Sequence, residues 1–126
     1  MKIAPIITLA SILFLLAFKN GQKIEWLTET TYDFGLIEPD KPVSIEFQYK
    51  NISSVPLTVD NVRTTCGCTT PEWTYEEVIL PDSAGVIKLE YDAKKIGPFK
   101  KVVRVFFNEQ KKGERLIIEG EVMEEE

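Results

Sequence analysis

Apolar and polar side chains alternate with a period of two along much of this chain. Between Val43 and Lys50, the apolar residues Val43, Ile45, Phe47 and Tyr49 are separated by single polar residues. Successive side chains of a β-strand point to opposite sides of the sheet, so this pattern predicts a strand with one buried face and one face in water. After the N-terminal apolar run, no segment has the i, i+3, i+4, i+7 spacing of an amphipathic helix.

Further segments repeat the pattern. It predicts strands at 57–60, 87–92 and 115–122, an apolar central strand at 102–107, and weaker strands at 24–28, 32–37 and 73–78. Turn-forming Gly, Pro, Asp and Ser residues lie between them. Seven to eight short strands without helices between them are typical of an antiparallel β-sandwich. We expect one shared core that contains Phe34, Phe47, Leu57, Leu89, Val103 and Ile118.

The first residues have a different composition. Lys2 precedes a nearly unbroken apolar run from Ile3 to Phe18. A positive charge followed by such a run, which is short for a membrane span, is typical of an export signal. We therefore expect residues 1–19 to be a signal peptide, or else an uncleaved anchor that makes the protein's membrane contact. Residues 23–126 are then a single domain exported to the periplasm or the cell exterior.

Charge and composition narrow the function. The chain carries 15 Lys and Arg against 20 Asp and Glu, and it has no histidine. An acidic protein repels phosphate backbones, so we expect no nucleic-acid partner. The absence of histidine removes Ser-His-Asp and Cys-His nucleophile systems and the commonest metal ligand. We expect no catalysis and no cofactor.

The sharpest local motif is Cys66-Gly67-Cys68-Thr69. In extended chain the two thiols lie on one face, and we expect Gly67 to turn the backbone toward positive φ and bring the sulfurs together. The interpretation that we favour is structural: two small thiols, or a local disulfide, shape a turn. The alternatives are thiol–disulfide exchange, binding of Cu(I) or Zn(II) by both thiolates, and a disulfide to another chain. Arg63 is the nearest cation in sequence that could lower a thiol pKa.

Several segments, in order, resemble a bacterial family of secreted domains of unknown function, family 1573, whose hallmark is a Ser-Cys-Gly-Cys-Thr box. The matching segments are 32–37, 47–51, 56–59, 62–69, 79–81 before Gly85, 97–101 and Asn108. This sequence has Thr65 where the family usually has Ser, and Asp40 and Asp82 where it usually has Gly in two turns. Aspartate tolerates such turns nearly as well as glycine does, so the expected fold is unchanged.

The resemblance implies an immunoglobulin-like sandwich, a distant similarity to modules of cilium and centrosome proteins, and export, often in Bacteroidetes. It implies no activity. We therefore expect an exported module with a binding or structural role in the bacterial envelope, whose partner is a protein or a glycan. The alternative is a periplasmic thiol protein that uses Cys66 and Cys68 for disulfide exchange or soft-metal binding. Trp26, Trp73 and Tyr75 are candidates for an aromatic binding face for carbohydrate or peptide, although core and half-buried strand positions explain aromatics in small β-domains more often.

Overall fold

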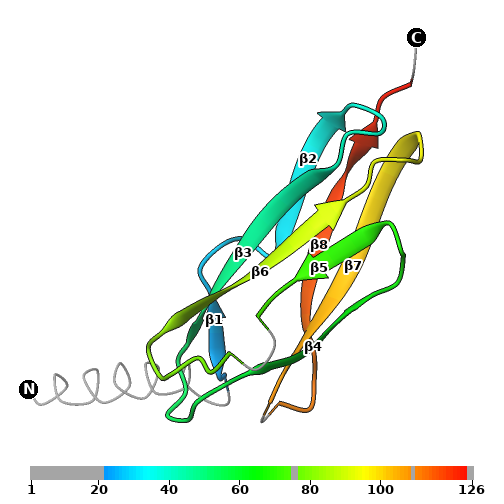
Figure 1. Ribbon diagram of the computed structural model, residues 1–126. Helices are drawn as coiled ribbons and strands as arrows, with labels where there is room; N and C mark the ends of the chain where they lie inside the picture. The colour runs from blue at the N-terminus through cyan, green and yellow to red at the C-terminus, as the bar shows by residue number, and fades with distance from the viewer. Residues whose placement is uncertain (1–21, 75–76, 109, 125–126) are drawn as a thin grey trace, which may run out of the picture.

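Eight strands form two layers in the computed structural model, which describes residues 22–74, 77–108 and 110–124 (Figure 1). The strands are β1 (Ile24–Trp26), β2 (Thr31–Ile37), β3 (Val43–Asn51), β4 (Val59–Thr64), β5 (Thr69–Glu72), β6 (Ala84–Tyr91), β7 (Gly97–Phe107) and β8 (Glu114–Val122). One sheet has the order β1-β3-β6-β5, and the other has the order β2-β8-β7-β4. The predicted all-β sandwich is confirmed.

The strand pairs are antiparallel with one exception, since β2 runs parallel to β8. We did not expect this pair. A parallel pair usually needs a crossover helix, but here the chain between the two strands passes through both sheets and returns in the right direction. β1 and β2 are consecutive, yet they belong to different sheets. The chain therefore changes layers immediately after its first strand.

The structure has no strand at the described residues 73, 74, 77 and 78 of the segment predicted at 73–78, while residues 75–76 lie outside the described part of the chain. The strand in this region is β5, which comes earlier and ends at Glu72, while Trp73 lies outside it and packs against the core. β5 has only one buried residue, Thr69, and it contains Pro71. A short polar edge strand has no apolar alternation to reveal it. The apolar residues that follow β5 led to a strand being predicted there instead.

The core lies between the sheets and contains most of the residues that the pattern predicted. Phe47 is 1% exposed, and Leu57, Leu89, Val103 and Ile118 are fully buried. Phe34, the sixth predicted residue, is only partly buried and packs against the edge of this cluster. Its strand, β2, is the outermost strand of its sheet, so a neighbouring strand covers it on one side only.

Asn51 is a fully buried polar residue whose side chain has all its partners. Its Nδ2 atom donates to the carbonyls of Val55 and Ile79, at 2.8 Å each. Its Oδ1 atom accepts from the amide and the hydroxyl of Ser53, at 2.9 and 2.6 Å. A buried polar group is stable only when it is paired in this way. Asn51 thereby fixes the loop that leaves β3 against the segment that precedes β6.

Two aspartates occupy turn positions that need a left-handed backbone. Asp40 has φ 59° and Asp82 has φ 67°, values that favour glycine and that aspartate tolerates better than most residues. These are the two positions where the related family usually has glycine. The structure thus explains both the usual residue and the substitution.

The part of the chain that the structure describes contains no helix long and apolar enough to cross a membrane. Residues 1–19, which the sequence assigns to a signal peptide or anchor, lie outside the described residues.

Truncation of a core side chain tests the packing. We expect Phe47→Ala to lower the free energy of unfolding by about 3–5 kcal/mol, because it removes a buried aromatic ring from between the sheets. Phe34→Ala is the matched control, and its cost should be clearly smaller because this ring is partly exposed. Urea unfolding curves of the two variants measure the difference. Equal losses would mean that the assigned core is wrong.

Candidate functional site

The Cys66-Gly67-Cys68 turn, called the CGC turn below, lies where the chain passes from one sheet to the other. It joins β4, the last strand of one sheet, to β5, the last strand of the other. A chain that changes layers has to leave one ladder before it can enter the next. The turn is therefore at an edge of the sandwich, where a covalent link can hold the crossing in place.

A disulfide joins Cys66 to Cys68, whose Cα atoms are 5.2 Å apart. This separation lies within the roughly 4.4–6.8 Å that disulfides accept. The turn also closes through its backbone, since the Cys68 amide donates to Cys66 Sγ at 3.2 Å. The amide of Thr69 and the hydroxyl of Thr64 both donate to the Cys66 carbonyl, at 3.3 and 3.2 Å. Polar groups at both ends of the turn are thus paired within it.

The CGC turn is anchored on β6. The amide of Asp92 donates to the Cys68 carbonyl at 3.0 Å, and the buried residue Thr69 pairs with Tyr91. The Tyr91 ring stacks on Phe99 of the other sheet, with ring centroids 3.9 Å apart. Burial, and then the negative charge of Asp92, raise the pKa of the Tyr91 hydroxyl above its usual value. The neutral ring therefore connects the turn to the core and to the opposite sheet.

Gly67 does not have the expected conformation. Within the described residues, the glycines with positive φ are Gly35 and Gly97. A Cβ atom added at Gly67 would meet nothing within 4 Å. Neither a left-handed backbone nor a close contact requires glycine at this position. The disulfide forms although Gly67 does not have the positive φ that we expected.

The surroundings of the two sulfurs favour a structural role. Both cysteines are partly exposed, but each is already bonded to the other. The Arg63 guanidinium, the cation considered for thiol activation, lies over the Phe106 ring, 5.1 Å from its centroid. Among residues 22–74, 77–108 and 110–124, no group of three His, Cys, Asp or Glu side chains could hold a metal ion. The turn is best described as a covalent closure of the crossing between the sheets.

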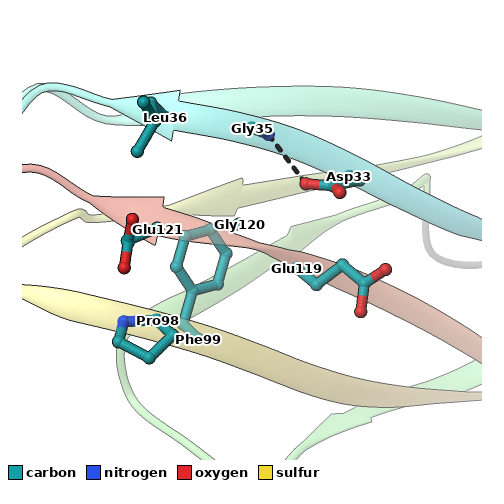
Figure 2. Close-up of a pocket in the computed structure, with 8 residues that line it drawn as sticks. All are labelled: Asp33, Gly35, Leu36, Pro98, Phe99, Glu119, Gly120 and Glu121. Carbon is teal, nitrogen blue, oxygen red and sulfur yellow. Dashed lines mark hydrogen bonds between the residues drawn. The ribbon is translucent and has the colours of Figure 1, made fainter.

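The second candidate site is a surface hollow of about 460 Å³ over β2, β8 and β7 (Figure 2). Figure 2 shows the residues that line it, Asp33, Gly35, Leu36, Pro98, Phe99, Glu119, Gly120 and Glu121. Leu36 is 66% exposed beside it. Three carboxylates belong to the lining, and no Lys or Arg does. The site thus combines an exposed apolar side chain with negative charge.

Two backbone features of the strands form this hollow, which we call the β2 hollow. The register of β2 against β8 shifts between Asp33 and Leu36, and Gly35 within this bulge has φ 70°. Asp33 Oδ1 accepts the Gly35 amide at 2.8 Å and so fixes the bulge. Opposite, a side chain on Gly120 would come within 3.0 Å of the Gly35 carbonyl and the Phe99 ring. Gly120 is thus a point where β2 and the Phe99 ring closely approach the backbone of β8.

The sequence gives only a weak sign of the β2 hollow. The segment 32–37, which includes Gly35, was one of the segments that resemble the family. The close approach of the Gly35 carbonyl to Gly120, at the register shift between β2 and β8, could not be read from it. Of the aromatic residues considered for a binding face, Trp26 and Trp73 are partly buried and pack against the core. Tyr75 lies outside the described residues.

Known structures with the same architecture identify the class of fold. The ASH/PapD-like domain 7 of human CEP192 matches with a TM-score of 0.68 and 11% identity, over 82% of this chain and 87% of that chain. A protein of unknown function from Porphyromonas gingivalis W83 matches with a TM-score of 0.66 and 16% identity, over 83% of this chain and 51% of that chain. At these identities the likeness concerns the fold alone. The protein is an immunoglobulin-like, PapD-like β-sandwich.

The same fold also matches part of a larger enzyme. The VesB protease of Vibrio cholerae aligns with a TM-score of 0.61 and 12% identity, over 86% of this chain and 34% of that chain. This chain thus spans about half of the Porphyromonas protein and about a third of the protease. No curated protein matches the sequence. Residues 24–122 match the family described as "Protein of unknown function (DUF1573)", and the chain belongs to that family.

A double variant, Cys66→Ser with Cys68→Ser, tests the structural role of the CGC turn. The disulfide closes a very short loop, so its removal should still leave a folded domain. We expect a loss of roughly 1–3 kcal/mol in the free energy of unfolding. Denaturant unfolding measures the loss, and dithiothreitol-treated wild type is the control that should match the variant.

Two results would contradict the structural role. One is a reduction potential near those of strong oxidants, about −120 to −180 mV, together with rapid exchange with a thiol substrate. The other is stoichiometric, tight binding of Cu(I) or Zn(II) by the reduced protein that the double variant loses.

Proposed function

We propose that this protein is an exported immunoglobulin-like module that binds a partner protein in the bacterial envelope and catalyses no reaction. The observation that carries the proposal is the β2 hollow, where exposed Leu36 pairs with Glu121 and where Asp33 and Glu119 add two further carboxylates to the lining (Figure 2). A concave site that combines an apolar side chain with a few polar or charged groups is the usual setting for ligand binding.

The chemistry of the β2 hollow favours a basic protein surface over a glycan. Sugar rings are held mainly by exposed aromatic faces, and the aromatic residue of this hollow, Phe99, is only 8% exposed. A lysine or arginine of a partner can cover Leu36 with its methylene groups while its cation meets Glu119 or Glu121. The same side chain therefore satisfies both the apolar and the acidic part of the site.

The disulfide supports export. Disulfides persist in oxidising compartments and are rare in the cytosol. The apolar run from Ile3 to Phe18 supplies an independent reason from the sequence. In this proposal the CGC turn stabilises the domain outside the cytoplasm and does not act on a substrate. The soft-metal alternative needs two free thiolates, whereas the disulfide engages both sulfurs.

The mass of the protein isolated from the envelope tests export. We expect cleavage between Ala17 and Gln22, and no alkylation of Cys66 or Cys68 by iodoacetamide until a reductant is added. Mass spectrometry of the intact protein, with and without reduction, reports both. An intact chain with freely alkylated cysteines in the cytoplasm would contradict the proposal.

Site-specific photocrosslinking in cells tests the binding role. A photoreactive residue at Leu36 should give an adduct of discrete mass with an envelope protein, because this side chain is 66% exposed at the β2 hollow. The same probe at Leu80 is the matched control, since Leu80 is 56% exposed but does not belong to the hollow.

Glu121→Lys should reduce the adduct at Leu36 severalfold by reversing a charge at the hollow. Its urea unfolding curve should match the wild type, because Glu121 is exposed. Equal adducts from Leu36 and Leu80, or an adduct unchanged by Glu121→Lys, would show that the hollow is not the binding site.

A further inference from the structure

β3 is longer than the strand beside it. β1 pairs with β3 only from Tyr49 to Asn51, because the chain leaves this sheet after Trp26. β3 itself continues back to Val43, in unbroken antiparallel register with β6. The side of β3 that faces away from β6 therefore has no neighbouring strand between Val43 and Phe47. We call this stretch the open edge.

The hydrogen-bonding groups of the open edge can be assigned from its neighbours. The Gln48 carbonyl accepts from the Leu27 amide at 2.8 Å, and the Gln48 amide donates to Thr28 Oγ1 at 3.2 Å. Gln48 thus points its backbone groups away from β6. Backbone groups alternate along an antiparallel strand, so Ser44 and Glu46 point theirs to the same side. Within the described part of the chain, these two amides and two carbonyls have no hydrogen-bond partner on that side.

Three of the four outer strands, β5, β2 and β4, are short or irregular, which the open edge is not. β5 has four residues and contains Pro71, which has no amide to donate. β2 changes register between Asp33 and Leu36, and β4 does so between Val59 and Asn61. Short strands, prolines and bulges are the usual means by which proteins prevent pairing with other chains. The open edge has neither a proline nor a register shift.

A hollow of about 330 Å³ lies beside the open edge. It is lined by Thr28, Glu29, Tyr32, Ile45, Glu46 and Phe47. Ile45 and Phe47 are the inward-facing residues of this part of β3. A strand added to β3 places every second side chain on the same inward side, so one of its side chains would enter this hollow. The backbone groups and the hollow thus match one extended chain.

We propose that the partner binds by adding an extended segment, with alternating basic and apolar residues, as a new antiparallel strand on the open edge. The inference rests on the proposed binding role and names a second surface for it. Strand addition takes its affinity from backbone hydrogen bonds and its specificity from alternate side-chain pockets. Glu29 and Glu46 line the hollow and no Lys or Arg does, so charge favours a basic segment.

The same charges disfavour a second copy of this chain as the occupant. Pairing of two open edges would bring Glu29 and Glu46 of both copies onto one seam, and like charges across a strand pair are destabilising. The described chain joins this sheet at Lys23, whose carbonyl accepts the Ile52 amide at 2.9 Å. This point lies at the end of β3 that is far from the open edge.

The probe for the open edge is a capped seven-residue peptide in which lysine and valine alternate. Its valines should face the hollow, and its lysine amides should face Ser44 and Glu46. Isothermal titration with the full chain should give saturable one-to-one binding in the micromolar range. Methylation of the lysine backbone amides should weaken binding at least tenfold. Methylation of the valine amides leaves the charge and composition equal and should change it little.

Ser44→Pro is the matching change in the protein, and Ser44→Ala is its control. The Ser44 amide points away from β6, so proline removes a donor of the open edge without removing a bond of the sheet. We expect at least tenfold weaker binding for Ser44→Pro, wild-type binding for Ser44→Ala, and the same urea midpoint for both.

Equal binding of the two methylated peptides, or undiminished binding to Ser44→Pro, would overturn the inference. Absence of peptide binding would also overturn it, while an adduct at Leu36 would still support the proposed function. If the probe at Leu36 gives no adduct but the peptide still binds, the role of the β2 hollow is contradicted and strand addition is supported.

Discussion

The apolar faces of two sheets must be buried against each other, and every other feature of this domain follows from that requirement. To build both layers from one chain, the backbone has to cross between the sheets, and each crossing takes residues out of a hydrogen-bonded ladder. Two crossings matter most: from β1 to β2, and from β4 to β5. The first leaves β3 without a neighbour over part of its length. The second is closed by the disulfide between Cys66 and Cys68.

The two crossings solve the same problem in different ways. At the CGC turn, a covalent bond and backbone hydrogen bonds hold the chain against β6, and Tyr91 transmits this contact to Phe99 on the other sheet. Between Trp26 and Thr31, the chain crosses without such a closure and leaves backbone groups of Ser44 and Glu46 available. One crossing is thus held by a covalent bond, whereas the other leaves part of a sheet edge exposed. β2 links the two candidate binding surfaces, since Tyr32 lines one hollow and Leu36 the other.

The sequence predicts those parts of the structure that depend on burial. Alternation identifies β3, β6 and β8, and five of six predicted core residues are buried. It misses β5, where Thr69 is the one buried side chain, and it overestimates Phe34, which lies on an outer strand. The cysteine pair is visible as a motif, but its place between the sheets is not. The β2 hollow and the open edge arise from register, a bulge at Gly35 and the early end of β1, and none of these leaves an apolar pattern.

Amide hydrogen exchange of the free protein tests the central claim that the first crossing leaves β3 unpaired. If it does, the amides of Ser44 and Glu46 exchange rapidly, as in an exposed loop, while those of Ile45 and Phe47 are protected by their bonds to β6. Alternating protection along one strand, read residue by residue from NMR spectra, is the predicted result. Equal protection of all four amides would show that this edge is already covered and would contradict the account.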